Sequence, residues 1–193
     1  MKRYIPITIN KLAKEENLID KEAYKTTIKA NENEEDYIKR LVADYTQLIE
    51  LYNGEHRYHN IRGCTYYRQG EHQKAMEDFT RAIELNDIEP LYYRNRGLLY
   101  MQLNMLEKAL QDFTKAIELQ NTDSLSYKMR AKAYYELKEY DKAIEDYTHV
   151  ISMDSRCAEA FLGRADAYRM QGNLEAAIND YEKVRKIQSL SIQ

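Results

Sequence analysis

The sequence predicts an all-α solenoid of antiparallel helix pairs, and three observations carry this prediction. Only six glycines and two prolines occur among 193 residues, and so few backbone breakers exclude turn-rich β-sandwiches, collagens and flexible linkers. Hydrophobic residues reach 44% although charged residues make up 32%, a balance that favours amphipathic helices over a disordered chain. The third observation is a repeat of 34 residues that runs along most of the chain.

Equivalent residues recur every 34 positions without insertion or deletion. Chance does not keep several columns of identical residues aligned over four copies, so the repeat decides the architecture. The clearest columns are Arg62, Arg96, Arg130 and Arg164; Tyr66, Tyr100, Tyr134 and Tyr168; and Asp78, Asp112, Asp146 and Asp180. We expect the arginine and aspartate columns to make polar contacts between helices or between repeats rather than to catalyse a reaction.

The apolar residues within each copy follow a helical period. In the second copy, Tyr93, Gly97 and Tyr100 are spaced i, i+4, i+7, and Ala109 and Phe113 begin a second stripe of the same kind. Small residues at Gly97 and Ala109 allow two helices to approach closely, with aromatic rings beside them. Short breaks such as 69–71 and 171–173 separate the two stripes. The expected helices, in chain order, are 56–69, 72–86, 90–103, 106–120, 124–137, 140–153, 158–171 and 174–188.

This pattern resembles the tetratricopeptide repeat family, in which an aromatic and a small residue are followed by tyrosine, alanine, an aromatic and alanine. The first copy carries these residues as His59, Gly63, Tyr66, Ala75, Phe79 and Ala82. The closing proline of the family pattern is replaced by Asp87, Asn121, Ser155 and Ser189, which are also turn-forming residues. The resemblance implies a right-handed superhelical solenoid whose first helices line a concave groove for partner peptides.

The repeat frame divides the chain into six segments of one continuous domain. Residues 22–55 align as a degenerate repeat, because Leu41, Asp44 and Tyr45 fall in register with Ala75, Asp78 and Phe79. Its first helix is expected around 22–31, and residues 1–21 are expected to form an atypical N-terminal cap. The full repeats are 56–89, 90–123, 124–157 and 158–191.

The resemblance implies that the residues that contact a partner lie on one stripe of the first helices. We expect a groove whose centre is basic and apolar, with acidic residues only at its C-terminal end, and a plain mixed-charge helix surface is the alternative. The candidate groove residues are Arg57, Asn60, Tyr67, Leu91, Arg94, Leu98, Met101, Lys128, Lys132 and Tyr135.

Other chemistry finds little support in the sequence. His56 and His59 lack a third zinc ligand, so His59 is interpreted as a core residue and His56 as exposed. Cys64 and Cys157 lack a catalytic motif and are expected to be free thiols. No phosphate-binding loop occurs, so we expect no enzyme activity, no metal and no cofactor.

A net charge of −3 disfavours nucleic acid as a partner, and no apolar run is long enough for a signal peptide or a membrane span. A cytoplasmic location is the default expectation.

The expected partner is a protein or peptide with acidic and bulky apolar residues. Co-chaperones of the family hold heat-shock-protein C-termini with a Lys, Asn, Asn, Lys, Arg clamp. The matching positions here are Asn60, Cys64, Asn95, Leu125 and Met129. Because only Asn95 fits the clamp, a heat-shock-protein C-terminus is disfavoured as the ligand.

A self-associating structural or regulatory subunit is the alternative function. The apolar face after the fourth repeat, including Val184, Ile187 and Leu190, is expected to be partly uncovered. Exposed apolar stripes favour association, so a homodimer through the C-terminal edge is the second hypothesis.

Overall fold

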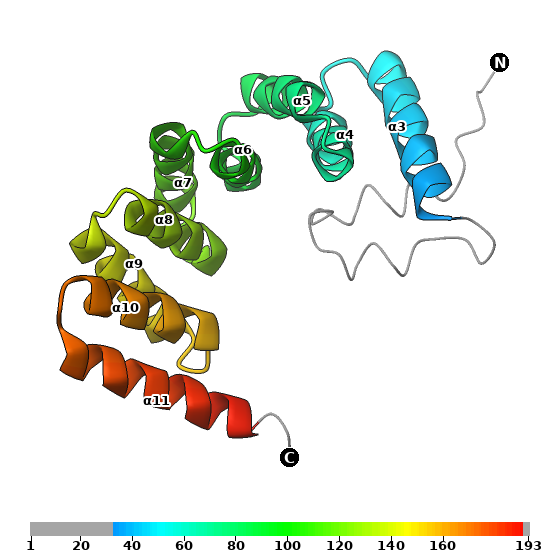
Figure 1. Ribbon diagram of the computed structural model, residues 1–193. Helices are drawn as coiled ribbons and strands as arrows, with labels where there is room; N and C mark the ends of the chain where they lie inside the picture. Colours follow the sequence, from blue (N-terminus) through cyan, green and yellow to red (C-terminus); the bar gives the residue numbers. More distant parts are fainter. Residues whose placement is uncertain (1–32, 191–193) are drawn as a thin grey trace. The chain divides into compact units, whose positions relative to one another are not determined.

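The computed structural model describes residues 33–190, and all regular structure in this part of the chain is α-helical (Figure 1). The chain divides into two compact units, Met1–Asn95 and Arg96–Gln193. The first unit contains α3 (Glu34–Leu51), α4 (His56–Gln69), α5 (His72–Leu85) and the beginning of α6 (Pro90–Gln102). The second contains the rest of α6, followed by α7 (Leu106–Leu119), α8 (Ser124–Glu136), α9 (Tyr140–Met153), α10 (Ala158–Met170) and α11 (Leu174–Leu190).

The predicted helices of the four full repeats are confirmed, with ends that agree to within two residues. The helix α3 corresponds to the predicted second helix of the degenerate repeat. It begins after Asn33, whose side chain accepts a hydrogen bond from the Asp36 backbone N–H at 2.8 Å, and so satisfies one free donor of the first turn. The predicted cap 1–21 and the predicted helix 22–31 lie outside the described residues.

A left-handed residue ends the first helix in each of the four full repeats. Gly70, Asn104, Lys138 and Gly172 have φ angles of 75°, 56°, 63° and 82°, and they are spaced by one repeat length. This conformation reverses the chain and lets the second helix pack back on the first. The sequence indicated the turn at the two glycines but not at the asparagine and the lysine.

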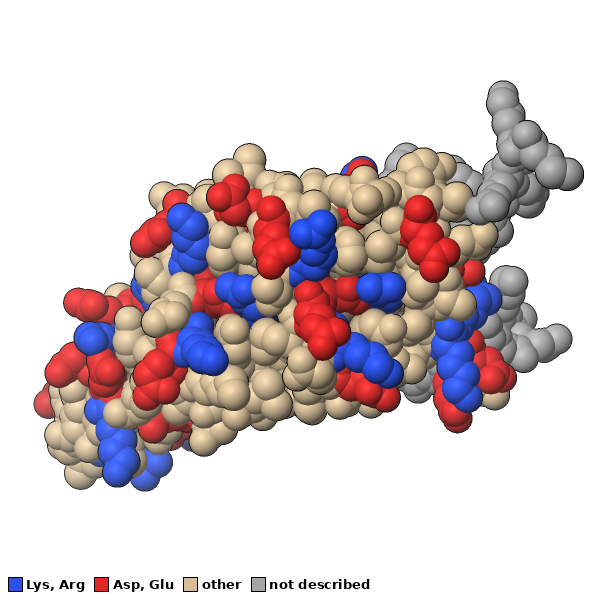
Figure 2. Space-filling view, turned by 90° about the horizontal axis from the view of Figure 1, so that it is seen from above, with Lys and Arg blue, Asp and Glu red and all other residues tan. Residues whose placement is uncertain are grey.

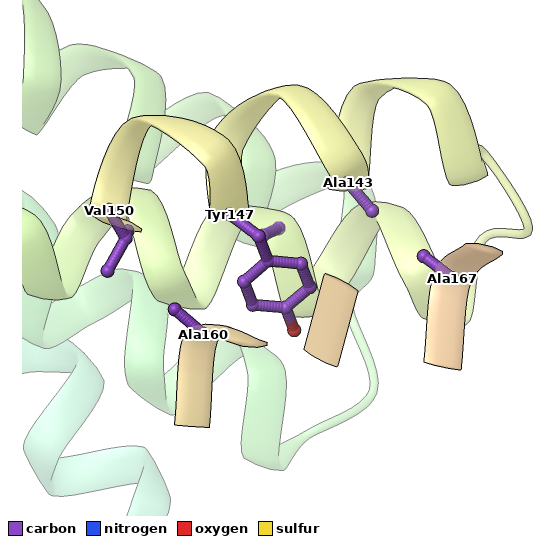
Figure 3. Packing of buried hydrophobic residues seen from close by; sticks show 6 residues of the cluster. Ala143, Tyr147, Val150, Ala160 and Ala167 are labelled. Carbon is purple, nitrogen blue, oxygen red and sulfur yellow. The ribbon is translucent and has the colours of Figure 1, made fainter. Parts of the chain in front are cut away.

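The small residues of the first helices allow the close approach that the sequence predicted. A Cβ atom built on Gly63 lies 2.9 Å from the ring of Phe79, and one on Gly97 lies 2.8 Å from the ring of Phe113. The rings therefore occupy the space that larger residues at these positions require. A further buried cluster joins α9 to α10, where Ala143, Tyr147 and Val150 pack with Ala160 and Ala167 (Figure 3).

The arginine and aspartate columns connect three consecutive helices. In α4, Arg62 donates from Nε to Asp78 of α5 at 2.8 Å and from Nη1 to Thr46 of α3 at 3.0 Å. The prediction of contacts between helices and between repeats is confirmed. The same arrangement recurs for Arg130 with Asp146 and Thr114, and for Arg164 with Asp180 and Thr148.

Within the described residues, no helix has the length and apolar character that crossing a membrane requires.

Candidate functional site

The ten candidate groove residues divide equally between the two units. In the first unit, Arg57, Asn60 and Leu91 meet around a cavity of about 30 Å³ between α4 and the start of α6. A cavity of this volume holds about one water molecule, so it accommodates a single small group and not a peptide side chain of any size.

Asn60 is a buried residue that makes a polar contact inside the first unit. Its side chain is 2% exposed, and its Oδ1 accepts a hydrogen bond from Asn95 Nδ2 at 2.8 Å. The same amide nitrogen lies 3.4 Å from the sulfur of Cys64. Asn60 thus satisfies a buried polar group of α6, which is a structural role.

The thiol of Cys64 is buried and is expected to be unreactive. Burial raises the pKa of the Cys64 thiol to about 12, although the positive charges of Arg68 and Arg94 oppose the rise. Both Cys64 and Cys157 are free thiols, as predicted. Since the thiolate is the reactive form, this environment does not suit a nucleophile at Cys64.

The other candidates of the first unit lie at or near the surface. Arg57 is exposed, and its Nε donates to Glu55 Oε1 at 3.0 Å, which lowers the pKa of that carboxyl group. Tyr67, Leu91 and Arg94 are half-buried. Of these residues, Arg57 is the most accessible, but Glu55 already balances its charge.

The histidines of α4 have roles that the sequence predicted only in part. His59 is a partly buried residue whose Nδ1 lies 3.0 Å from Asp78 Oδ1, and its core role is confirmed. The expectation that His56 is exposed is wrong, because its Nδ1 lies 2.5 Å from the hydroxyl oxygen of Tyr92 in α6. In the part of the chain that the structure describes, no group of three or more histidine, cysteine, aspartate or glutamate residues is arranged to hold a metal ion.

In the second unit, the candidates lie on α6 and α8. Leu98 and Met101 are half-buried on α6, and Tyr135 is half-buried on α8. The ammonium group of Lys128 forms an ion pair with Glu159 of α10. Lys132 is exposed and has no ion pair with any other residue of the described chain. Lys132 is therefore the candidate cation whose charge is available to a ligand.

A further polar cluster joins α10 to α11. The hydroxyl of Tyr181 donates to Asp166 Oδ1 at 2.6 Å, and Arg169 approaches the same carboxylate at 3.7 Å. The pKa of Tyr147 is raised to about 12, chiefly by burial and further by the charges of Asp166 and Tyr135. The sequence signal was the replacement of Phe79 and Phe113 by Tyr147 in the same repeat column.

Charges of both signs are interspersed over the face seen in Figure 2, with no large field of one sign. On this face, the charge is thus local rather than concentrated in one patch.

Comparisons with known proteins agree with the repeat and the fold. Profiles of the tetratricopeptide repeat family match residues 56–87, 90–123 and 128–189. No curated protein matches the chain.

Several solved structures share the fold. The crystal structure of MamA is 20% identical, with a TM-score of 0.75, and the match covers 78% of this chain and 88% of that one. YrrB, described as "a TPR protein with an unusual peptide-binding site", is 21% identical over 96% of this chain and 94% of its own, with a TM-score of 0.72. The first TPR of Spaghetti (RPAP3), bound to an HSP90 peptide, is 21% identical over 61% of this chain and 94% of its own, with a TM-score of 0.60. Given the family matches, the regular repeat and the helix pairs, this chain belongs to the tetratricopeptide repeat family.

Proposed function

We propose that the chain is a non-catalytic scaffold that binds a partner peptide or protein along the first helices of its repeats. The observation that carries the proposal is the exposed Lys132, which lacks an ion pair among the described residues and lies one turn before the half-buried Tyr135 on α8. A cation beside apolar and aromatic surface favours a segment with an acidic residue and a bulky apolar residue.

The two kinds of contact contribute differently to binding. Attraction to Lys132 speeds the encounter and weakens as salt is added. Burial of an apolar anchor against half-buried residues such as Leu98, Met101 and Leu125 determines most of the lifetime of the complex, because dissociation must expose the buried apolar area to water again.

The peptide partners of the structural neighbours support a peptide ligand in general terms. YrrB has a peptide-binding site, and the Spaghetti repeat domain holds an HSP90 peptide. In this chain, Asn95 occupies a clamp position but hydrogen-bonds to Asn60, and the other four clamp positions carry asparagine, cysteine, leucine and methionine where the clamp has lysine, asparagine, lysine and arginine. We therefore propose a ligand other than a heat-shock-protein C-terminus.

Selection from a displayed library of random decapeptides tests this function. We expect the full chain to enrich acidic peptides with a bulky apolar residue, and Lys132→Glu to weaken their binding at least tenfold, about 1.4 kcal/mol. Lys115→Glu is the control, because Lys115 is also an exposed lysine but lies on α7, the second helix of its repeat, where it pairs with Glu118. Failure to enrich any peptide, or equal loss in both variants, would contradict binding at this surface.

Self-association is the second candidate function, and a specific observation on α11 favours it. Leu174 and Ile178 are 60% and 58% exposed, whereas the residue equivalent to Leu174 in the second repeat, Leu106, is 8% exposed. Val184 and Ile187, which the sequence singled out, are half-buried. The most exposed apolar residues of α11 thus lie near its start, and the side chain of Leu190 lies outside the described residues.

A further inference from the structure

The turn that connects α3 to α4 contains an asparagine followed directly by a glycine, Asn53–Gly54 (Figure 1). No other asparagine of the sequence precedes a glycine. The Glu55 N–H donates to the carbonyl oxygen of Tyr52 at 3.1 Å, and this hydrogen bond closes a turn with Asn53 and Gly54 at its centre. Gly54 has a φ angle of 104°, which a residue without a Cβ atom adopts readily.

The Asn53 carboxamide and the backbone nitrogen of Gly54 are both accessible. The two residues are exposed, and no neighbouring group lies within 4 Å of a Cβ atom built on Gly54. Among the described residues, neither the carboxamide nor the Gly54 N–H has a hydrogen-bond partner. An electrophilic carbon and an adjacent nitrogen are therefore both free to react with each other.

The turn between α6 and α7 holds the corresponding groups differently. Asn104 is also an exposed turn residue, with a φ angle of 56°. The next backbone N–H, that of Met105, donates to the carbonyl oxygen of Tyr100 at 2.8 Å. This hydrogen bond must break before the nitrogen can attack, and the Met105 side chain crowds the nitrogen in addition. Of these two turns, only the one at 52–55 leaves the attacking nitrogen unbonded.

We propose that Asn53 is a site of spontaneous deamidation through a cyclic imide. The backbone nitrogen of Gly54 loses its proton and bonds to Cγ of Asn53, and the carboxamide nitrogen leaves as ammonia. Water then adds to one of the two carbonyl carbons of the imide ring and opens it. The product is aspartate or isoaspartate, a covalent change of the chain that consumes one water and needs no oxidant or reductant.

The reaction changes the charge and the length of the turn. Either product adds one negative charge to a chain whose net charge is −3. Isoaspartate also adds one methylene group to the main chain, inside the loop that the hydrogen bond between Glu55 and Tyr52 closes. Beyond the turn, α3 and α4 stay in contact through the rings of Tyr45 and Tyr58, whose centroids are 6.1 Å apart. We therefore expect the modified chain to remain folded.

Incubation of the full chain in mildly acidic and mildly alkaline solution tests the site. Tryptic peptides are compared by mass spectrometry with those of an unincubated sample. We expect the peptide 41–57 to gain the mass difference between an amide and an acid, faster in alkali because the attacking nitrogen must lose its proton. Isoaspartate in this peptide, detected with an isoaspartyl methyltransferase, shows that the imide formed. We expect deamidation of Asn104 to be at least about tenfold slower, equivalent to a barrier about 1.4 kcal/mol higher.

Two variants separate the chemistry from the structure. Asn53→Gln is expected to stop the reaction, because the longer side chain must close a larger ring. Met105→Gly creates a second Asn–Gly pair in which the glycine N–H has the Tyr100 carbonyl oxygen as its acceptor, and glycine is tolerated before a helix. We expect this pair to react more slowly than Asn53 in the same sample.

Three results would overturn the proposal. The first is deamidation of Asn53 that is no faster than that of Asn104 in the parent chain. The second is a product without isoaspartate, which excludes the imide. The third is equal reaction of the two Asn–Gly pairs in Met105→Gly, which refutes selection by the unbonded N–H. Circular dichroism before and after incubation is expected to be unchanged, so that the rates report on the folded chain.

Discussion

At the scale of single residues, the left-handed turn positions show which local preferences the fold overrides. Gly70 and Gly172 adopt positive φ without a Cβ clash, so sequence and structure agree there. Lys138 adopts φ 63° at the equivalent position, although a Cβ atom makes this conformation unfavourable by roughly 1–2 kcal/mol. The packing of α9 on α8 holds the lysine in this conformation, because the turn must have the same shape in every repeat.

Replacement of this lysine by glycine is expected to stabilise the protein. Lys138→Gly removes the Cβ strain, partly offset by the greater backbone entropy of glycine in the unfolded chain, for a net gain of about 0.5–1 kcal/mol. Urea unfolding followed by circular dichroism measures the change. The reciprocal variant Gly172→Lys is expected to shift the midpoint in the opposite direction. A lower midpoint for Lys138→Gly would show that the side chain of Lys138 contributes more than its backbone costs.

At the scale of elements, the arginine column accounts for much of the order of the helix stack. Each of Arg62, Arg130 and Arg164 makes two hydrogen bonds to the aspartate of its own repeat and one to a threonine of the preceding second helix. The hydrogen bond to Asp146 raises the pKa of Arg130, and burial opposes this rise. Such an arrangement fixes the relative placement of three helices, because the planar guanidinium group donates its hydrogen bonds in fixed directions.

Loss of one carboxylate is expected to weaken this link strongly. Asp146→Asn leaves Arg130 with a neutral partner in a site where the two side chains are 17% and 8% exposed. We expect a loss of about 2–3 kcal/mol in unfolding free energy, below the loss for a fully buried pair because the arginine retains some water contact. Calorimetry or urea unfolding provides the measurement. Glu118→Gln, which removes the exposed pair with Lys115, serves as the control with a change below about 0.5 kcal/mol. Equal effects of the two variants would refute the structural importance of the column.

At the scale of the whole molecule, the exposed edge of α11 predicts an association that depends on concentration. Leu174 and Ile178 lie one turn apart and are both more than half exposed, so contact with a second copy buries apolar area. Sedimentation equilibrium at high micromolar concentration is expected to detect a dimer, and the variant Leu174→Glu/Ile178→Glu to remain monomeric. Leu162→Glu, at an exposed apolar residue of α10, is the control. A monomeric parent chain under these conditions rules out self-association through this edge.

The sequence predicted the helices better than the candidate site, and the reason is physical. Repeat spacing and the helical period fix Gly63 against Phe79 and Arg62 near Asp78, because these contacts lie within one unit of the repeat. The burial of Asn60 depends instead on Asn95 of the next repeat, and the charge of Lys128 is balanced by Glu159 of α10. Such contacts depend on how successive first helices align, which no single repeat encodes. The close approach of Tyr147 to Gly163, where a Cβ atom would lie 2.3 Å from Cζ of the ring, was missed for the same reason.

The direction of the arginine contacts has a consequence for the order in which the protein is made. Arg62, Arg130 and Arg164 each bond to an aspartate 16 residues later and to a threonine 16 residues earlier. On a ribosome, all partners of each arginine have therefore emerged once the second helix of its own repeat has left the exit tunnel. None of these three arginines waits for a later repeat. Synthesis from the N-terminus can thus add one finished helix pair at a time to a nascent chain that is already folded behind it.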